Sequence, residues 1–353
     1  MIIGWTIDKT NNVFRGTIIY SGKLKKLAKR VSGLNKRIRH SSFPLLVVSL
    51  VLNVSLVALI LNKTVFDNNP ESTSQTRHPY LSKRVFIENQ NDVLINFMSL
   101  RSSLNEYTSS AKDKVGIYFE YLPSGTSIGI NDKKEIRLSS LAKVPTVMAT
   151  YKLIEQDKLT EDKLLVIQEQ HRDSQFGSLW RKEPGDKITV SEAARLAIIE
   201  SDNTAHNLLL ANLPGGEIDK VYSSLDIPLN KSDGGYPIIS AKSYSSILRS
   251  LYLSSYLSRE YSNKILEIMT GTIYKDKVPA LLPSSVKVAH KVGVYQRQPP
   301  AISAYSDCGI IYVPNRPYLV CMMIEGTEND AVRYMSETSK IIYDYVSTVK
   351  GGL

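Results

Sequence analysis

The feature that most constrains this chain is an uncharged apolar run of nineteen residues, 43–61. As a helix rising about 1.5 Å per residue, the run would span roughly 28 Å, the thickness of one bilayer core. A buried core helix is the alternative, but eight Lys or Arg residues between Lys23 and Arg39 favour a membrane anchor. A cleaved signal peptide fits less well, because the preceding region is very long and no small-residue cleavage site follows. We therefore expect a transmembrane signal anchor over residues 43–62.

Charge and composition divide the rest of the chain around this anchor. Residues 1–42 hold ten Lys or Arg and one acid, whereas the remaining 311 residues hold 34 basic and 33 acidic groups. The net charge of +10 therefore belongs to a basic cytoplasmic segment and gives no reason to expect a nucleic-acid partner. Residues 63–80 are too polar to bury a core and are expected to form a flexible linker. Residues 81–353 would be the folded domain, placed outside the cell membrane.

The pattern of apolar residues in this domain predicts strands at both ends of the sequence and helices between them. One antiparallel five-stranded sheet flanked by helices, plus an all-helical subdomain, explains this order and gives an α/β (α+β) fold. The turn of the first hairpin would be Pro123-Ser124-Gly125. The expected elements are a helix over about 81–111, strands 115–121 and 126–130, a helical block over about 139–272, strands 286–294, 307–313 and 318–324, and a helix over about 329–349.

The two cysteines, Cys308 and Cys321, lie on the last two predicted strands. A two-residue turn at Asn315-Arg316 would place Cys308 opposite Met323 and Cys321 opposite Ile310. The sulfur atoms would then lie diagonally, too far apart for an unstrained bridge. An extracellular location permits a disulfide, but this register favours free, buried thiols.

A first candidate for chemistry is Ser140, with Lys143 three residues later. Ser140 opens a predicted helix, whose N-terminal dipole would stabilise an oxyanion there. Lys143 would lie on the same face one turn away, and a partly apolar pocket would lower its pKa enough to accept the serine proton. An ordinary N-cap serine followed by a solvated lysine is the alternative, and the pattern alone does not decide between them.

Two further patterns follow along the chain. Ser201-Asp202-Asn203 ends a helix that begins with a capping box at Thr189, and Ser201 could relay a proton while Asn203 holds a substrate carbonyl or Lys143. A polar helix connection is the alternative. In His290-Lys291-Val292-Gly293, a lysine on a central strand would bind an anionic substrate, and Gly293 would leave room beside the backbone. An edge-strand lysine in water is the alternative there.

The three patterns in this order make the chain resemble the penicillin-recognising serine hydrolases, particularly their class A β-lactamase-like branch, over roughly residues 90–350. The resemblance implies that Ser140 attacks a β-lactam or cell-wall peptide carbonyl, with an oxyanion hole formed by the backbone of Ser140 and of a residue near Tyr295. Lys143 would be the base, directly or through Ser201. Lys291 would bind the substrate carboxylate and Asn203 would orient the ligand.

Two departures from the family pattern narrow this expectation. Val292 stands where the family has threonine in K-T-G, which removes a hydroxyl; Arg297 is one residue that could compensate. The E-x-x-L-N glutamate that activates water in class A enzymes is missing, and Asp233 is the best placed acid of the interval that should hold it, although a turn aspartate explains it more simply. Acylation is therefore expected and fast deacylation is not.

Three functions remain open from the sequence. A β-lactamase-like hydrolase comes first, a D,D-peptidase or penicillin-binding protein with slow deacylation second, and a non-catalytic wall-binding domain third. The five histidines show no ligand spacing, so neither a metal nor a cofactor is expected.

Overall fold

The computed structural model describes residues 3–7, 14–18, 49–50, 53, 78–81, 95–111, 113–232, 234–297 and 302–350. The chain divides into two compact units, residues 1–73 and 74–353. The described part of the first unit contains a hairpin of β1 (Ile3–Ile7) and β2 (Phe14–Ile18), with Ile3 opposite Ile18, which the sequence did not predict. The predicted anchor and linker lie almost entirely outside the described residues. Within the described part of the chain, no helix combines the length and the apolar character needed to span a bilayer.

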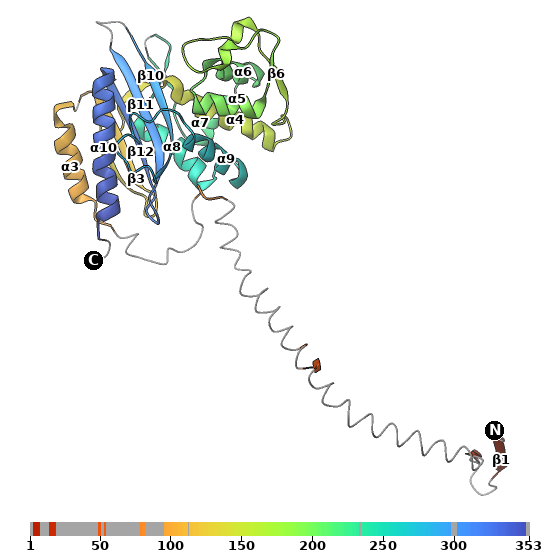
Figure 1. Cartoon of the computed structure of the whole chain (residues 1–353). Helices are drawn as coiled ribbons and strands as arrows, with labels where there is room; N and C mark the ends of the chain where they lie inside the picture. The colour runs from red at the N-terminus through yellow and green to blue at the C-terminus, as the bar shows by residue number, and fades with distance from the viewer. Residues whose placement is uncertain are drawn as a thin grey trace. The chain divides into compact units, whose positions relative to one another are not determined.

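The second unit is built on an antiparallel five-stranded sheet in the order β10-β11-β12-β3-β4 (Figure 1). The predicted sheet is confirmed, including the hairpin turn before Thr126. Strand β3 is buried along its whole length and β11 and β12 along most of theirs, which explains why their sequences are mainly apolar. The strands are β3 (Val115–Tyr121), β4 (Thr126–Ile130), β10 (Lys287–Tyr295), β11 (Ser303–Tyr312) and β12 (Tyr318–Gly326).

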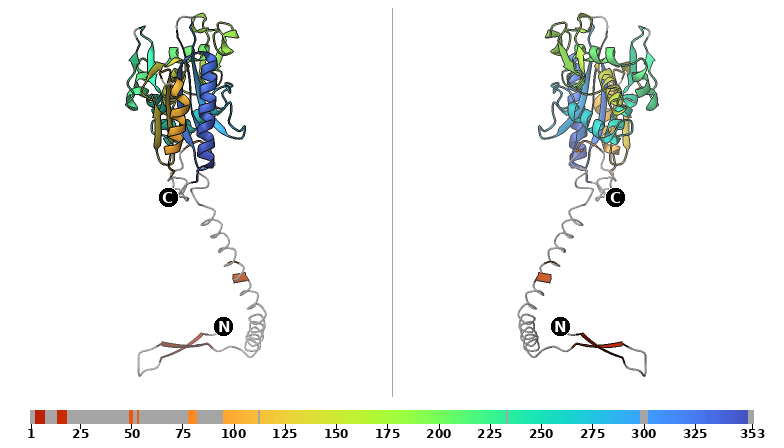
Figure 2. Two further views of the ribbon diagram at one scale, coloured as in Figure 1. Left: turned by 90° about the vertical axis from the view of Figure 1, so that its left-hand side faces the viewer. Right: turned by 90° about the vertical axis from the view of Figure 1, so that its right-hand side faces the viewer.

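Helices cover both faces of this sheet. On one face α3 (Met98–Thr108) and α10 (Glu328–Thr348) lie side by side, as the left view of Figure 2 shows. They enclose one apolar core with residues such as Phe119 and Tyr318. On the other face α8 (Ala241–Leu253) packs against the sheet, and the larger apolar core continues from it into the helical part.

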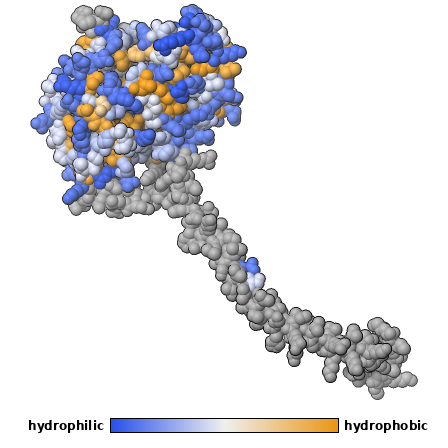
Figure 3. Space-filling view, in the orientation of Figure 1, coloured by the Kyte–Doolittle hydropathy of each residue, from blue (hydrophilic) through white to orange (hydrophobic). Residues whose placement is uncertain are grey.

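The helical part holds the remaining helices and also short strands, so the predicted all-helical subdomain is wrong in this detail. Thr189 caps α5, as its capping-box sequence predicted, and Ser240 caps α8. Polar residues surround smaller apolar areas on the face of the unit shown in Figure 3. The elements are α4 (Lys143–Glu155), α5 (Val190–Ile199), α6 (Asn203–Asn212), α7 (Glu217–Ser224), α9 (Arg259–Thr270), the sheet β5-β9-β8 (Glu135–Arg137, Pro237–Ser240, Asn230–Lys231) and the pair β6-β7 (Leu164–Val166, Lys187–Thr189).

The cysteine prediction is wrong. Cys308 lies directly opposite Cys321 in the β11–β12 ladder, and the two form a disulfide. The last pair of the ladder is Ile311 with Tyr318, so the connection is longer than a two-residue turn. This shifts the register by two residues and brings the two side chains together on one face.

The predicted central position of Lys291 also needs correction, because β10 is an edge strand of the sheet. Its side chain is nevertheless fully buried. Helix α9 and the turn Ser139–Ala142 both contact β10 and cover this part of it. By its hydrogen bonding β10 therefore lies at the edge of the sheet, but the side chain of Lys291 on this strand lies in the interior of the protein.

Candidate active site

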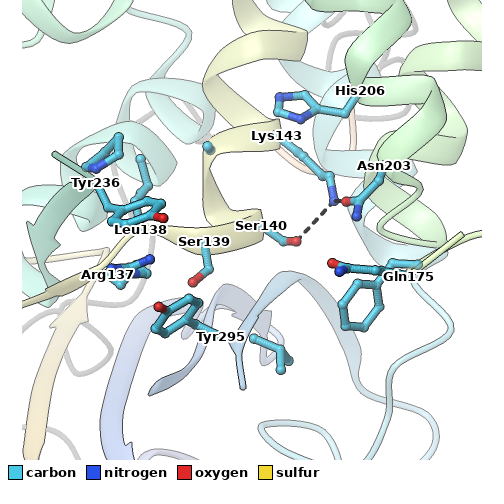
Figure 4. Close-up of a pocket in the computed structure, with 14 residues that line it drawn as sticks. Arg137, Leu138, Ser139, Ser140, Lys143, Gln175, Asn203, His206, Tyr236 and Tyr295 are labelled. Atoms are coloured by element: carbon cyan, nitrogen blue, oxygen red, sulfur yellow. Dashed lines mark hydrogen bonds between the residues drawn. The ribbon is translucent and has the colours of Figure 1, made fainter. Parts of the chain in front are cut away.

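A pocket of about 350 Å³ opens between the sheet and the helical part (Figure 4). Ser140 lies in its middle. We call Lys143, Ser201, Asn203 and Lys291 the lysine end of the site. The residues that line the pocket are Arg137, Leu138, Ser139, Ser140, Ala142, Lys143, Gln175, Phe176, Asn203, His206, Tyr236, Pro237, Val294 and Tyr295.

Ser140 is held on a tight turn that enters helix α4. Ser139, just before it, has a φ of 48°, a left-handed conformation that is uncommon for a residue with a side chain. A short 3₁₀ turn over Ser139–Ala142 then runs into the helix. Gly293 lies against this turn, since a Cβ on it would lie 3.2 Å from Leu141 Cγ and 3.5 Å from the Leu138 carbonyl oxygen. Gly293 thus leaves room for the nucleophile's own turn and does not line the pocket.

Lys143 connects the nucleophile to the Ser201-Asp202-Asn203 loop. Its Nζ donates to the Ser201 carbonyl oxygen and to Asn203 Oδ1, each at 2.6 Å, and lies 3.0 Å from Ser140 Oγ. The first two oxygens can only accept hydrogen bonds. A neutral amine has two hydrogens, so after these two bonds its lone pair is left for Ser140. The contact geometry therefore suits proton transfer from Ser140 to Lys143.

Ser201 bridges the two lysines. Its Oγ accepts from Lys291 Nζ at 2.9 Å and lies 3.2 Å from Lys143 Nζ. Ser201 is buried and has a φ of 55°, so its side chain is held in this place by a strained backbone. Lys291 also donates to the Val292 carbonyl oxygen at 3.0 Å. A hydroxyl shared by two amines can pass a proton between them and a substrate.

Burial changes the acidity of three groups around this loop. Burial lowers the pKa of Lys143 to about 8, against the opposing charges of Asp202 and Asp173. Burial, followed by repulsion from Lys143, holds the pKa of Lys291 well below its usual range. Burial and the charges of both lysines lower the pKa of His206 to about 3. The lowered pKa of Lys143 makes its neutral amine accessible near neutral pH, as a general base requires.

Asp202 holds the Ser201-Asp202-Asn203 loop in place through two hydrogen bonds to backbone N–H groups. It caps α6 by accepting from the backbone N–H of Ala205 at 2.7 Å, and its other oxygen accepts from Leu179 N at 2.7 Å. Gly177 has a φ of +90°, and a Cβ there would lie 2.1 Å from Asp202 Oδ2. Because that approach excludes any side chain, glycine is required at position 177.

Asp173 and His206 complete the surroundings of Lys143. Asp173 accepts from Asn203 Nδ2 at 3.1 Å and so orients the amide whose oxygen accepts from Lys143. His206 Nε2 lies 3.0 Å from Thr146 Oγ1, and that hydroxyl donates to the Ala142 carbonyl oxygen. His206 must then donate from Nε2, which leaves the lone pair on Nδ1. Sequence reasoning had singled out neither residue.

The structure brings most of the predicted site residues to this pocket. Ser140, Lys143, Asn203 and Tyr295 line it. Ser201 and Lys291 lie directly behind them and reach the site through hydrogen bonds. The sequence analysis did not suggest several of the other lining residues, because none of them belongs to one of the three motifs: Arg137, Gln175, Phe176, His206 and Tyr236.

The described lining contains no aspartate or glutamate. Of the acids between Ser201 and Ser240, Glu217 pairs with Lys220 on α7, and neither Asp219 nor Asp226 lines the pocket. Asp233, the predicted best placed acid, lies outside the described residues. Across the described ranges, no group of three or more His, Cys, Asp or Glu side chains could hold a metal ion.

Comparison with known proteins supports the resemblance to a family. Residues 99–346 match the model of the family described as "Beta-lactamase enzyme family". A structure of PBP-A aligns with a TM-score of 0.64 at 22% identity, covering 71% of this chain and 97% of that one. The TLA-3 extended-spectrum β-lactamase aligns with a TM-score of 0.66 at 20% identity, covering 72% and 100%.

A class A β-lactamase representative from Bacteroides cellulosilyticus aligns with a TM-score of 0.63 at 22% identity, covering 70% of this chain and 99% of that one. A comparison with curated proteins gives no match. The structural similarities support the fold, and the family match covers more than two thirds of the chain. The chain therefore belongs to the β-lactamase enzyme family and is a serine hydrolase.

Proposed function

We propose that Ser140 forms an acyl-enzyme with a β-lactam or a cell-wall peptide, and that Lys143 is the base for this step. The observation that carries the proposal is the contact of Lys143 Nζ with Ser140 Oγ at 3.0 Å, with the other amine hydrogens already directed to pure acceptors. A lysine whose pKa is lowered to about 8 is neutral often enough near neutral pH to accept the serine proton. The Ser140 oxygen then bonds to the carbonyl carbon.

Ser201 and Lys291 would complete the acylation. As the carbon–nitrogen bond of the substrate breaks, the leaving nitrogen needs a proton, and Ser201 Oγ can supply it and recover one from Lys143. Lys291 lies on the other side of the same hydroxyl at 2.9 Å and would attract a substrate carboxylate on the leaving-group side. Val292 is buried and contributes no hydroxyl to that role.

Release of the acyl group is proposed to be slow. Activating a water molecule requires a base besides Lys143, whose amine is hydrogen-bonded to Ser201 and Asn203 and faces Ser140, and the described lining offers no carboxylate. His206 is the remaining imidazole there, but a pKa of about 3 makes it a weak proton acceptor. This favours a penicillin-binding protein or D,D-peptidase over an efficient β-lactamase. Among similar structures, one of a PBP-A mutant is an acyl-enzyme complex with penicillin G.

We also propose that residues 43–62 anchor the protein in the cell membrane, with the hydrolase unit on the extracytoplasmic side. The support is the uncharged run 43–61 behind a basic segment. Expression of the full chain, followed by fractionation and protease treatment of intact cells, tests this. Recovery of the unit in the wash of alkaline-extracted membranes would contradict it.

Labelled benzylpenicillin tests the chemistry on the full chain in detergent. We expect a mass increase of one penicillin on the peptide that contains Ser140, and none in Ser140→Ala. A chromogenic cephalosporin then distinguishes the two enzyme classes, since one stoichiometric burst indicates slow deacylation and sustained turnover a β-lactamase. The non-catalytic alternative predicts no adduct at any pH, and that result would overturn the proposal.

A further inference from the structure

Arg137 is clamped between two tyrosine rings at the end of the pocket away from Lys143 (Figure 4). Its guanidinium carbon lies 3.6 Å from the centre of the Tyr236 ring and 3.7 Å from that of Tyr295. All three residues line the pocket, and Arg137 precedes Ser140 by only three positions, at the end of strand β5. We call these three residues the arginine end.

The clamp leaves the hydrogen-bond donors of Arg137 unused within the described part of the chain. No described carboxylate or carbonyl oxygen accepts from its guanidinium, and its side chain is partly exposed to the pocket. Other arginines of the unit differ in this respect. Arg249 pairs with Glu120, and Arg195 pairs with Glu192.

A guanidinium with both faces covered by aromatic rings is held flat, and its edge is the part that remains available. That edge presents parallel N–H groups, which match the two oxygens of a carboxylate. Holding the group in one orientation before the ligand arrives reduces the entropy lost on binding. The arginine end is therefore prepared for a planar anion.

The position of this end relative to Ser140 indicates which part of a substrate reaches it. Ser201 and Lys291, which serve the leaving group in the proposed mechanism, lie at the lysine end. Ser140 lies between the two ends, and Arg137 is on the far side of it (Figure 4). A substrate that crosses Ser140 therefore directs its acyl side toward Arg137.

We propose that Arg137, held by Tyr236 and Tyr295, is a subsite for a free carboxylate on the acyl side of the substrate. This inference rests on the proposed function and specifies its substrate, since the preferred substrate would be a cell-wall peptide whose acyl portion carries an anionic side group. A neutral acyl side would leave the guanidinium without its partner.

Two penicillins that differ by one carboxylate provide the test. Carbenicillin is benzylpenicillin with a carboxylate on the acyl side chain, so the ratio of their acylation rate constants measures the subsite. We expect the full chain to prefer carbenicillin by about tenfold or more, the range of a charge-assisted hydrogen bond. Arg137→Gln should bring the ratio close to one, and Arg137→Lys, which keeps the charge without the planar fork, should give an intermediate ratio.

Arg333 serves as the matched control, because it also lies over an aromatic ring, that of Tyr334 on helix α10, but outside the pocket lining. Arg333→Gln should keep the carbenicillin preference. Loss of the preference in Arg333→Gln with retention in Arg137→Gln would overturn the assignment, as would a full chain without preference.

Equilibrium binding separates this inference from the proposed function. In a Ser140→Ala background, calorimetry with the two penicillins measures the same preference without acylation. If benzylpenicillin forms no adduct on the natural chain, the proposed function is wrong. The ratio of the two dissociation constants still tests whether Arg137 binds a carboxylate on the acyl side. Thermal melting of each variant excludes misfolding, and an equal dissociation constant for both penicillins in folded Ser140→Ala would refute the subsite.

Discussion

At the lysine end of the pocket, Lys143 has four hydrogen-bond contacts with three residues, and Ser201 is shared by two lysines. At the arginine end, Arg137 has two ring contacts and no described hydrogen-bond acceptor. At the lysine end the polar groups bond to one another, and they serve a proton transfer that every substrate requires. At the arginine end the guanidinium of Arg137 faces the pocket and can distinguish one substrate from another. Chemistry and specificity are therefore separated on the two sides of Ser140, and variants at each end should act differently.

The largest effect is expected from removing Lys143. Lys143→Ala should lower the acylation rate by about 10²–10⁴-fold, the usual contribution of a general base. Because both penicillins need the same proton transfer, their rate ratio should stay at its natural value. Stopped-flow measurement of acylation checks both numbers, with Lys152→Ala as control, a lysine of the same helix that pairs with Glu155. A changed ratio in Lys143→Ala would mean that the two ends are not separate.

Gly177 leaves room for Asp202, which holds the loop of the lysine end in place. Replacing Gly177 should have the next largest effect, on the free energy of unfolding. Gly177→Ala places a Cβ 2.1 Å from Asp202 Oδ2 in a backbone with a φ of +90°. Gly185→Ala is the matched control, since Gly185 has a φ of +99° and nothing lies within 4 Å of its Cβ position. The backbone strain is common to both, so the clash should cost about 1–3 kcal/mol more at position 177.

Urea denaturation of the two alanine variants measures this difference. Equal free energies of unfolding would show that the segment before Leu179 moves away from Asp202 at little cost. That result would weaken the view of the lysine end as a rigid arrangement.

The contrast between the ends also explains what the sequence could predict. Ser140 and Lys143 are one helical turn apart, so a four-residue pattern already brings them together. The pairing of distant patterns through Ser201 and Lys291 followed only from the resemblance to a family. The strands were predictable from long apolar runs, because strands such as β3 and β12 are buried along most of their length and have few polar positions.

The features that were missed depend on contacts without a local signal. Tyr236 and Tyr295 reach Arg137 from positions far along the chain, and no spacing rule relates the three. Gly177 is explained only by the approach of Asp202. The disulfide was missed because a register depends on loop length, and an assumed two-residue turn displaced Cys308 from its partner by two residues.

His206 provides a third test, on stability as a function of pH. Its pKa in the folded protein is about 3, below the value near 6.5 that an unfolded chain would have. Between these values the unfolded state binds a proton that the folded state refuses, so stability is highest above pH 6.5 and falls as the pH decreases toward 3. From pH 6.5 to 5 the loss should approach about 2 kcal/mol, at roughly 1.4 kcal/mol per pH unit.

His206→Gln removes this titration and keeps a donor for Thr146. Urea denaturation of both proteins across this pH range should therefore give curves that converge as the pH falls. Parallel curves would show that the imidazole is not held neutral by burial and by the two lysines.

The smallest effect concerns the pH dependence of acylation, and it compares the two ends directly. With a pKa of about 8, Lys143 loses its neutral fraction about tenfold per pH unit below that value. The acylation rate should thus rise with pH and level off above pH 8, for benzylpenicillin and carbenicillin alike. An arginine keeps its charge over this whole range, so the ratio of the two rates should stay constant while each rate changes. A ratio that varied with the same midpoint would show that Lys143, and not Arg137, senses the carboxylate, because only the lysine end titrates there.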